Sequence, residues 1–161
     1  MALVNTYPYT LLTRGLLTHF KKRREKSLIL TICSTISFGP SSYDALYACT
    51  KVFEEFTVKT LSAELGEVSR VDFLTMHPQY VSTNNARLPA GGLVDTPEAF
   101  VNATIKEVGI ERYREKCGTW KHNISGAVIK SLHSLLGRWN LQQAIIERVI
   151  RGKAKKMWAK R

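Results

Sequence analysis

The chain has 161 residues, of which 44% are hydrophobic, and a formal net charge of +11. This length and composition are ordinary for one globular domain with a single core. The positive charge gathers at residues 21–26 and 148–161. Because no helix-turn-helix, zinc or RNA-binding signature accompanies these clusters, binding to nucleic acid is disfavoured. A face toward anionic lipid and plain solvated charge remain as alternatives.

The hydrophobic pattern predicts helices and strands that alternate along the chain. In chain order these are a helix at 6–20, a strand at 27–34, a helix at 43–65, a strand at 70–76, a flexible loop at 84–95, a helix at 96–109, a short strand at 118–123 and a helix at 124–150. Pro8 is tolerated only in the first turn of its helix. Thr96 and Pro97 have the types preferred at a helix start, and Gly109 is the expected stop.

The last predicted helix, 124–150, has a long apolar pattern that charged residues interrupt. No stretch reaches the roughly 18 to 20 uncharged residues that a membrane-spanning helix needs. An amphipathic helix on a membrane surface, with Trp139 at the interface and the basic tail on lipid headgroups, fits this pattern. A helix packed on the sheet fits it equally well.

Three side chains have a spacing that suits the reduction of a carbonyl group. Tyr47 and Lys51 are four residues apart, and Ser34 ends the strand-like run thirteen residues before the tyrosine. On a helix, residues four apart share a face, so the ammonium lies beside the phenol and favours the phenolate. Tyr47 would then donate a proton to a ketone oxygen that Ser34 holds by a hydrogen bond.

The tyrosine–lysine pair by itself is a weak signal, because it recurs by chance on ordinary surface helices. Its context strengthens the prediction: Ser34 closes a strand, turn residues follow at 37–42, and Tyr47 opens a helical pattern.

Over residues 5–150 the chain resembles the short-chain dehydrogenase/reductase family, in the branch of 17-beta-hydroxysteroid dehydrogenases and very-long-chain 3-oxoacyl-CoA reductases. Ser34, Tyr47 and Lys51 match the family's catalytic positions, and Asn5 matches its active-site asparagine, which helps to hold a water in the proton relay. This resemblance implies an α/β fold, namely the C-terminal half of a Rossmann-like, doubly wound parallel sheet, followed by a C-terminal amphipathic helix.

The resemblance also implies a binding site for a nicotinamide cofactor. The stretch 77–83 is similar to the family's loop that contacts the nicotinamide carboxamide, with Pro78, Val81 and Thr83 at the matching positions. Tyr47 and Lys51 would bind the cofactor as well, the lysine through the nicotinamide ribose. Gln79 departs from the family, in which many relatives have glycine. NADPH is the expected cofactor, and NADH is not excluded.

No glycine-rich phosphate-binding motif occurs in the sequence. Residues 1–123 are therefore expected to form a partial catalytic domain that lacks its N-terminal cofactor-binding half, and residues 124–161 an amphipathic helix with a basic tail. Affinity for a whole dinucleotide should be low. Half of a doubly wound sheet would also leave an open strand edge, which predicts marginal stability or association with a partner.

The function expected from the resemblance is reduction of a ketone, with an acyl-CoA or a steroid as substrate. The implied location is the cytosolic face of the endoplasmic reticulum membrane, and a homodimer formed through the helices at 7–20 and 52–65 is a further alternative. A truncated, non-catalytic relative that docks on a membrane or a protein is the competing hypothesis. The three cysteines and four histidines have no metal-ligand spacing, so no metal is expected.

Overall fold

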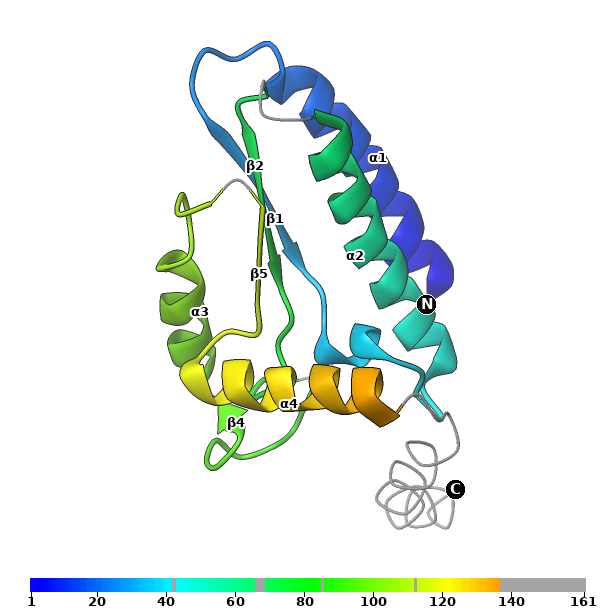
Figure 1. Ribbon diagram of the computed structural model, residues 1–161, viewed down its shortest axis with the longest axis vertical. Coiled ribbons are helices and arrows are strands. Elements are labelled where there is room, and N and C mark those ends of the chain that lie inside the picture. The colour runs from blue at the N-terminus through cyan, green and yellow to red at the C-terminus, as the bar shows by residue number, and fades with distance from the viewer. Residues whose placement is uncertain (42, 66–68, 85, 112, 137–161) are drawn as a thin grey trace.

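The computed structural model describes residues 1–41, 43–65, 69–84, 86–111 and 113–136. The predicted helix at 124–150 and the basic tail thus lie largely outside the described residues. The elements in chain order are α1 Ala2–Phe20, β1 Ser27–Ile32, the 3-10 helix η1 Thr35–Phe38, α2 Ala45–Leu65, β2 Val71–Met76, β3 Tyr80–Val81, β4 Val94–Asp95, α3 Pro97–Ile105, β5 Tyr113–Lys116 and α4 Trp120–Leu136. Figure 1 shows their arrangement.

A parallel sheet with strand order β1-β2-β5 forms the centre of the fold. Every residue of β2 is buried, as expected for a central strand that is covered on both faces. In the register of the sheet, Ile32 pairs with Met76, and Met76 pairs with Lys116. The three strands therefore end close together, which is the edge at which open α/β sheets bind ligands.

Helices cover both faces of this sheet. In Figure 1, α1 and α2 lie side by side on one face, α3 lies on the other, and α4 crosses the end where the strands stop. Apolar side chains of α1, α2, β1 and β2 form the main core, namely Leu17, Ile29, Val58, Val71 and Phe73. The α/β class and the parallel sheet that the sequence predicted are thus confirmed.

Two predicted helix limits differ from the structure. Helix α1 begins at Ala2, so Pro8 lies in its interior and not in its first turn. Proline cannot donate to the carbonyl four residues earlier, but Val4 is exposed, which leaves that carbonyl accessible to water. Helix α3 starts as predicted, with the Thr96 hydroxyl accepting from the Ala99 amide, but it ends at Ile105, before Gly109.

The predicted last strand at 118–123 is wrong. The strand is β5, Tyr113–Lys116, and α4 already begins at Trp120. Gly118, with φ of +113°, turns the chain between these two elements. Asn123 closes this turn by accepting from the Cys117 amide at 2.8 Å and donating to the Gly118 carbonyl at 3.0 Å. The division of the chain at residue 123 stays a prediction.

The segment predicted as a flexible loop, 84–95, is anchored at its end. Its last two residues form β4, which pairs with β3. Asp95 is buried and accepts from the Thr119 hydroxyl at 2.5 Å, and its carboxylate lies 3.3 Å from His122 Nδ1. Among the helices of the described residues, none combines the length and the hydrophobicity that a membrane-spanning segment requires.

Candidate active site

The predicted site residues come from segments that meet at the carboxyl end of the sheet. Ser34 follows β1 and Pro78 follows β2, and the Thr35 amide donates to the Pro78 carbonyl at 3.2 Å. Tyr47 and Lys51 lie in the first two turns of α2. The parallel register of β1 and β2 therefore places the serine loop directly beside the proline loop.

Tyr47 and Lys51 share a helix face, as their spacing predicted. The Lys51 ammonium lies 5.9 Å from the centroid of the tyrosine ring. It donates to the Ile32 carbonyl at 3.0 Å and to the Glu54 carboxylate at 2.8 Å. Burial raises the pKa of Glu54, although the bond from Lys51 opposes that rise. The ammonium is thus held between the end of β1 and a buried carboxylate.

Ser34 is partly buried at the start of η1. Its hydroxyl oxygen accepts a hydrogen bond from the Ile36 amide at 3.3 Å, which is the usual role of a serine at a helix N-cap. Because the oxygen acts as the acceptor in this bond, its own proton is available to a second acceptor such as a ketone oxygen.

Asn5 reaches the same helix from α1. Its side-chain amide donates to the Thr50 hydroxyl at 3.0 Å, and that hydroxyl donates to the Tyr47 carbonyl at 2.8 Å. Asn5 is therefore connected to the backbone of the tyrosine's own turn through one intervening side chain.

The predicted cofactor-binding residues after β2 have fewer contacts with Tyr47 and Lys51. Pro78 and Val81 are partly buried, and Thr83 is exposed. The Thr83 hydroxyl accepts from the Ala86 amide at 3.2 Å. Within the described residues, no hydrogen bond joins Thr83 to Tyr47 or Lys51. The structure thus assembles Ser34, Tyr47, Lys51 and Asn5 around α2, while Thr83 stays apart.

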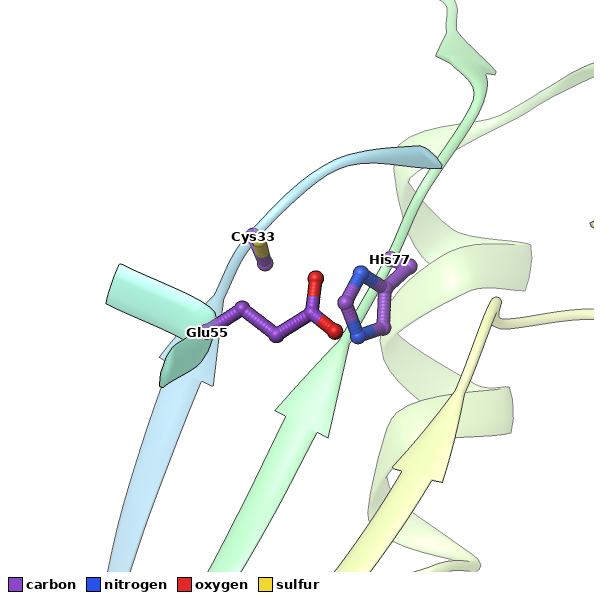
Figure 2. Close-up of side chains that lie close together, drawn as sticks. All are labelled: Cys33, Glu55 and His77. Carbon is purple, nitrogen blue, oxygen red and sulfur yellow. The ribbon is translucent and has the colours of Figure 1, made fainter. Parts of the chain in front are cut away.

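A polar cluster that sequence reasoning did not predict is buried beneath this site. Cys33, Glu55 and His77, hereafter the buried cluster, place one ligand atom each within 4.8 Å of the others (Figure 2). Each lies next to a site segment, because Cys33 precedes Ser34, His77 precedes Pro78, and Glu55 lies one helical turn after Lys51. The four-residue spacing of Glu55 and Lys59 on one helix could have indicated their ion pair, but it does not reveal the cluster.

Ser37 connects Glu55 with His77, and the Cys33 thiol donates to the Lys51 carbonyl at 3.1 Å. The Ser37 hydroxyl lies 2.6 Å from a Glu55 carboxylate oxygen, to which it donates, and 3.3 Å from His77 Nδ1. Lys59 forms ion pairs with Glu55 and, at 2.9 Å, with Glu115 on β5. The cluster thus joins α2 to all three strands.

Burial shifts the ionisation of these groups in different directions. It raises the pKa of the Cys33 thiol to about 11 and lowers the pKa of His77, which the charge of Glu55 opposes. For Glu115, burial favours a raised pKa, but hydrogen bonds from Tyr113 and Lys59 outweigh it and lower the pKa to about 2. At neutral pH the thiol is protonated and Glu115 is ionised.

A cavity of about 240 Å³ opens beside the buried cluster, between α4, η1 and the ends of β2 and β5. Its lining includes His77, Glu115, Cys117 and Lys130. Lys130 lies 3.4 Å from Glu115 and 5.4 Å from the centre of the Phe38 ring. His77 of the cluster and the exposed Lys130 of α4 therefore line the same cavity.

The sequence matches the short chain dehydrogenase family over residues 1–89, which is more than half of the chain. The chain belongs to the short chain dehydrogenase family. The matched region contains β1, α2 and β2 and the predicted residues Asn5, Ser34, Tyr47 and Lys51. Family membership, predicted from these motifs, is thereby confirmed.

Two curated members of this family are similar to the chain. Very-long-chain 3-oxoacyl-CoA reductase-B of Danio rerio is 30% identical over 110 residues, which are 68% of this chain and 34% of that protein. Very-long-chain 3-oxoacyl-CoA reductase of Neurospora crassa is 30% identical over 122 residues, which are 75% of this chain and 36% of that protein. The chain therefore spans about a third of the length of the curated relatives it matches.

A short chain dehydrogenase from Burkholderia cenocepacia, solved in complex with NADP, has the same fold. It superposes with a TM-score of 0.65 at 17% identity and covers 84% of this chain and 56% of that chain. At this identity the likeness establishes the fold, here the Rossmann-like arrangement of strands and helices that the family shares.

Proposed function

We propose that the chain carries the catalytic residues of a nicotinamide-dependent ketoreductase that acts on 3-oxoacyl-CoA thioesters. The observation that carries this proposal is that Lys51 lies beside the Tyr47 ring and donates to the Ile32 carbonyl, two residues before Ser34, in a chain similar to two very-long-chain 3-oxoacyl-CoA reductases. A steroid ketone is the alternative substrate class.

In this proposal each residue has a separate role. Tyr47 donates a proton to the ketone oxygen, and the Ser34 hydroxyl donates a hydrogen bond to the same oxygen. The Lys51 ammonium, 5.9 Å from the centre of the tyrosine ring, favours the phenolate that remains after proton transfer. Asn5 fixes the Tyr47 turn through Thr50 and serves the proton relay.

The described residues fit the nicotinamide end of a dinucleotide, preferably NADPH. Lys51 uses two of its three N–H donors on Ile32 and Glu54, which leaves one for a ribose hydroxyl. Pro78, Val81 and Thr83 would contact the nicotinamide carboxamide. When bound, the nicotinamide would supply the hydride. No glycine-rich phosphate-binding motif occurs in the 161 residues. The proposal therefore concerns a complete enzyme in which these residues are joined to a phosphate-binding half.

Replacement of Tyr47 by phenylalanine in the complete enzyme tests the proposal. We expect turnover of a 3-oxoacyl-CoA to fall about 10²- to 10⁴-fold, the usual contribution of a general acid. Tyr7→Phe is the matched control, because Tyr7 is exposed on α1 and has no proposed role in the reaction. Turnover of Tyr47→Phe near that of the control would refute the catalytic assignment and favour a non-catalytic relative.

We also propose that α4 lies on an anionic membrane surface, at the cytosolic face of the endoplasmic reticulum. Its support is an exposed apolar stripe at four-residue spacing, formed by Trp120, Ile124, Val128 and Leu132. Four exposed apolar side chains on one helix face, in a chain with a net charge of +11, suit an interfacial helix on anionic lipid.

Sedimentation with vesicles containing phosphatidylserine tests this second proposal. We expect Val128→Asp to reduce vesicle binding about tenfold, because it places a charge within the stripe. Ser134→Asp adds the same charge to an exposed position of α4 outside the stripe and should change binding much less. Equal losses in both variants would show that only net charge matters, and no binding by the unaltered protein would refute the proposal.

A homodimer formed through α1 and α2 completes the proposed assembly. Exposed apolar side chains on the two helices support it, among them Leu11, Leu16 and Phe56. Sedimentation equilibrium of the complete enzyme would test it, because a species that stays monomeric at micromolar concentration contradicts the dimer.

A further inference from the structure

The buried cluster brings three metal-ligand side chains together from three segments. Cys33 comes from the end of β1, Glu55 from α2 and His77 from the end of β2 (Figure 2). Their ligand atoms lie within 4.8 Å of one another, and the residues are 2%, 5% and 1% exposed. No short sequence spacing joins these three positions, because the parallel register of β1 and β2 creates their proximity.

The donor set matches the preferences of zinc. A thiolate, an imidazole and a carboxylate are the three kinds of side chain that Zn²⁺ binds in proteins, commonly with four ligands in all. Ser37 lies at the same place, with its hydroxyl 2.6 Å from Glu55 and 3.3 Å from His77 Nδ1. Because this hydroxyl lies against Nδ1, it orients the ring so that Nε2 can bind the ion, and a water that enters from the neighbouring cavity would complete the set.

One buried polar atom of the cluster lacks a partner among the described residues. His77 Nε2 makes no hydrogen bond there, although the side chain is almost fully buried. The nearest carboxylate oxygen, on Glu115, is 4.0 Å away. An unpaired buried nitrogen costs free energy, and the few that occur in native structures often indicate an ion or a water. Coordination of a metal would supply the missing interaction.

The surrounding charges are compatible with a divalent cation. Lys59 is the cation that now neutralises Glu55, and it also pairs with Glu115 at 2.9 Å. When a metal takes Glu55, Lys59 retains Glu115 as its partner. The charge of Zn²⁺ is balanced by one thiolate and one carboxylate, so the occupied site would be neutral and suited to burial.

We propose that Cys33, Glu55 and His77 form a binding site for a zinc-type divalent metal ion. The ion fastens the end of β1, the second turn of α2 after Tyr47 and the end of β2 to one another. Because Cys33 adjoins Ser34 and His77 adjoins Pro78, it holds the loops of the candidate active site without entering the reaction. The role is structural, and it does not depend on the proposed activity.

Cobalt substitution tests the site directly, with the purified 161-residue chain. One equivalent of Co²⁺ should produce the near-ultraviolet charge-transfer absorption of a thiolate–cobalt bond. Cys33→Ala should abolish this absorption, and Cys49→Ala should retain it because Cys49 is an exposed cysteine away from the cluster. Absence of the absorption in the unaltered chain, or its persistence in Cys33→Ala, would overturn the proposal.

A zinc titration of a second variant examines the carboxylate. Glu55→Gln keeps the size of the side chain and removes its charge, and we expect the dissociation constant for Zn²⁺ to rise at least about tenfold. Zinc should raise the thermal unfolding midpoint of the unaltered chain and leave that of Glu55→Gln nearly unchanged, because an ion that binds only the folded state stabilises it. Equal zinc affinity in the two proteins would refute the role of Glu55.

Discussion

Two groups of polar side chains lie next to each other where β1 and β2 end, and they differ in burial and in partners. The surface group, Ser34, Tyr47 and Lys51, is only partly buried. The buried cluster, Cys33, Glu55 and His77, is almost completely enclosed and shares its charges with Lys59 and Glu115. Cys33 and Ser34 are consecutive in the sequence, yet they belong to different groups.

Because of this difference, the surface group is suited to binding a ligand and the buried cluster to stabilising the fold. The surface group keeps hydrogen-bonding capacity for a ligand, because the Ser34 proton and one N–H of Lys51 have no partner among the described residues. In the buried cluster the polar groups are partnered by neighbours such as Ser37 and Lys59, and a buried charge that loses its partner is costly. Substitutions in the surface group should therefore alter turnover, whereas substitutions around the cluster should alter the free energy of unfolding.

Removal of the Lys59 ammonium should have the largest effect on stability. Lys59→Met leaves the Glu55 and Glu115 carboxylates without the cation between them, and we expect a loss of about 3 kcal/mol in the free energy of unfolding. Urea unfolding monitored by circular dichroism would measure it. The control is Lys26→Met, because Lys26 is exposed and 3.9 Å from Asp72, and such pairs contribute about 0.5 kcal/mol or less. If both variants lost a similar free energy of unfolding, the buried ion pairs of Lys59 would not matter more than the exposed pair of Lys26.

Glu115→Gln should have a smaller effect that depends on pH. The carboxyl has an ordinary pKa of 4.5 and a pKa of about 2 in the folded protein, so it stabilises the fold at every pH above the ordinary value. We expect the variant to be about 2 kcal/mol less stable at pH 7. This difference should shrink as pH falls from about 4.5 toward 2. Urea unfolding at pH 7 and pH 3 would detect it, and a constant difference would contradict the assignment.

Glu54→Gln should have the smallest effect on stability, about 1 kcal/mol or less, because the amide still accepts a hydrogen bond from Lys51. Its effect should appear in cofactor binding instead. Loss of the carboxylate charge weakens this bond, so one more N–H of Lys51 can turn to a ribose hydroxyl of the cofactor. The KM of the complete enzyme for the nicotinamide cofactor should therefore change. An unchanged KM would show that Glu54 does not control the position of Lys51.

Local patterns in the sequence predicted the elements and the face shared by Tyr47 and Lys51. A four-residue spacing on a helix and a serine at a strand end are short-range features, which a sequence displays directly. The sequence also predicted the start of α3, because Thr96 and Pro97 are strong local signals. It misplaced the last strand, since the polar residues Tyr113–Lys116 form β5 through pairing with β2, a contact between distant segments.

The buried cluster was not predicted either, because it too depends on contacts between distant segments of the chain. Its three members are separated by 22 residues on each side, at positions 33, 55 and 77, and no local spacing joins them. The role of Glu54 was not predicted either. A sequence does not show that this charged side chain is buried and paired with Lys51. Both features depend on how β1, α2 and β2 pack together.

The uninterrupted pairing of Ser27–Ile32 with Val71–Met76 restricts how this segment can change during evolution. Insertion of one residue within β1 would move Cys33 and Ser34 by one position relative to α2, so neither the thiol nor the hydroxyl would keep its present place. A substitution alters one side chain at a time. A change in the length of β1 would disrupt the surface group and the buried cluster together. Sequence change in β1 is therefore expected to proceed by replacement, and changes of length should accumulate in the connections, such as residues 21–26.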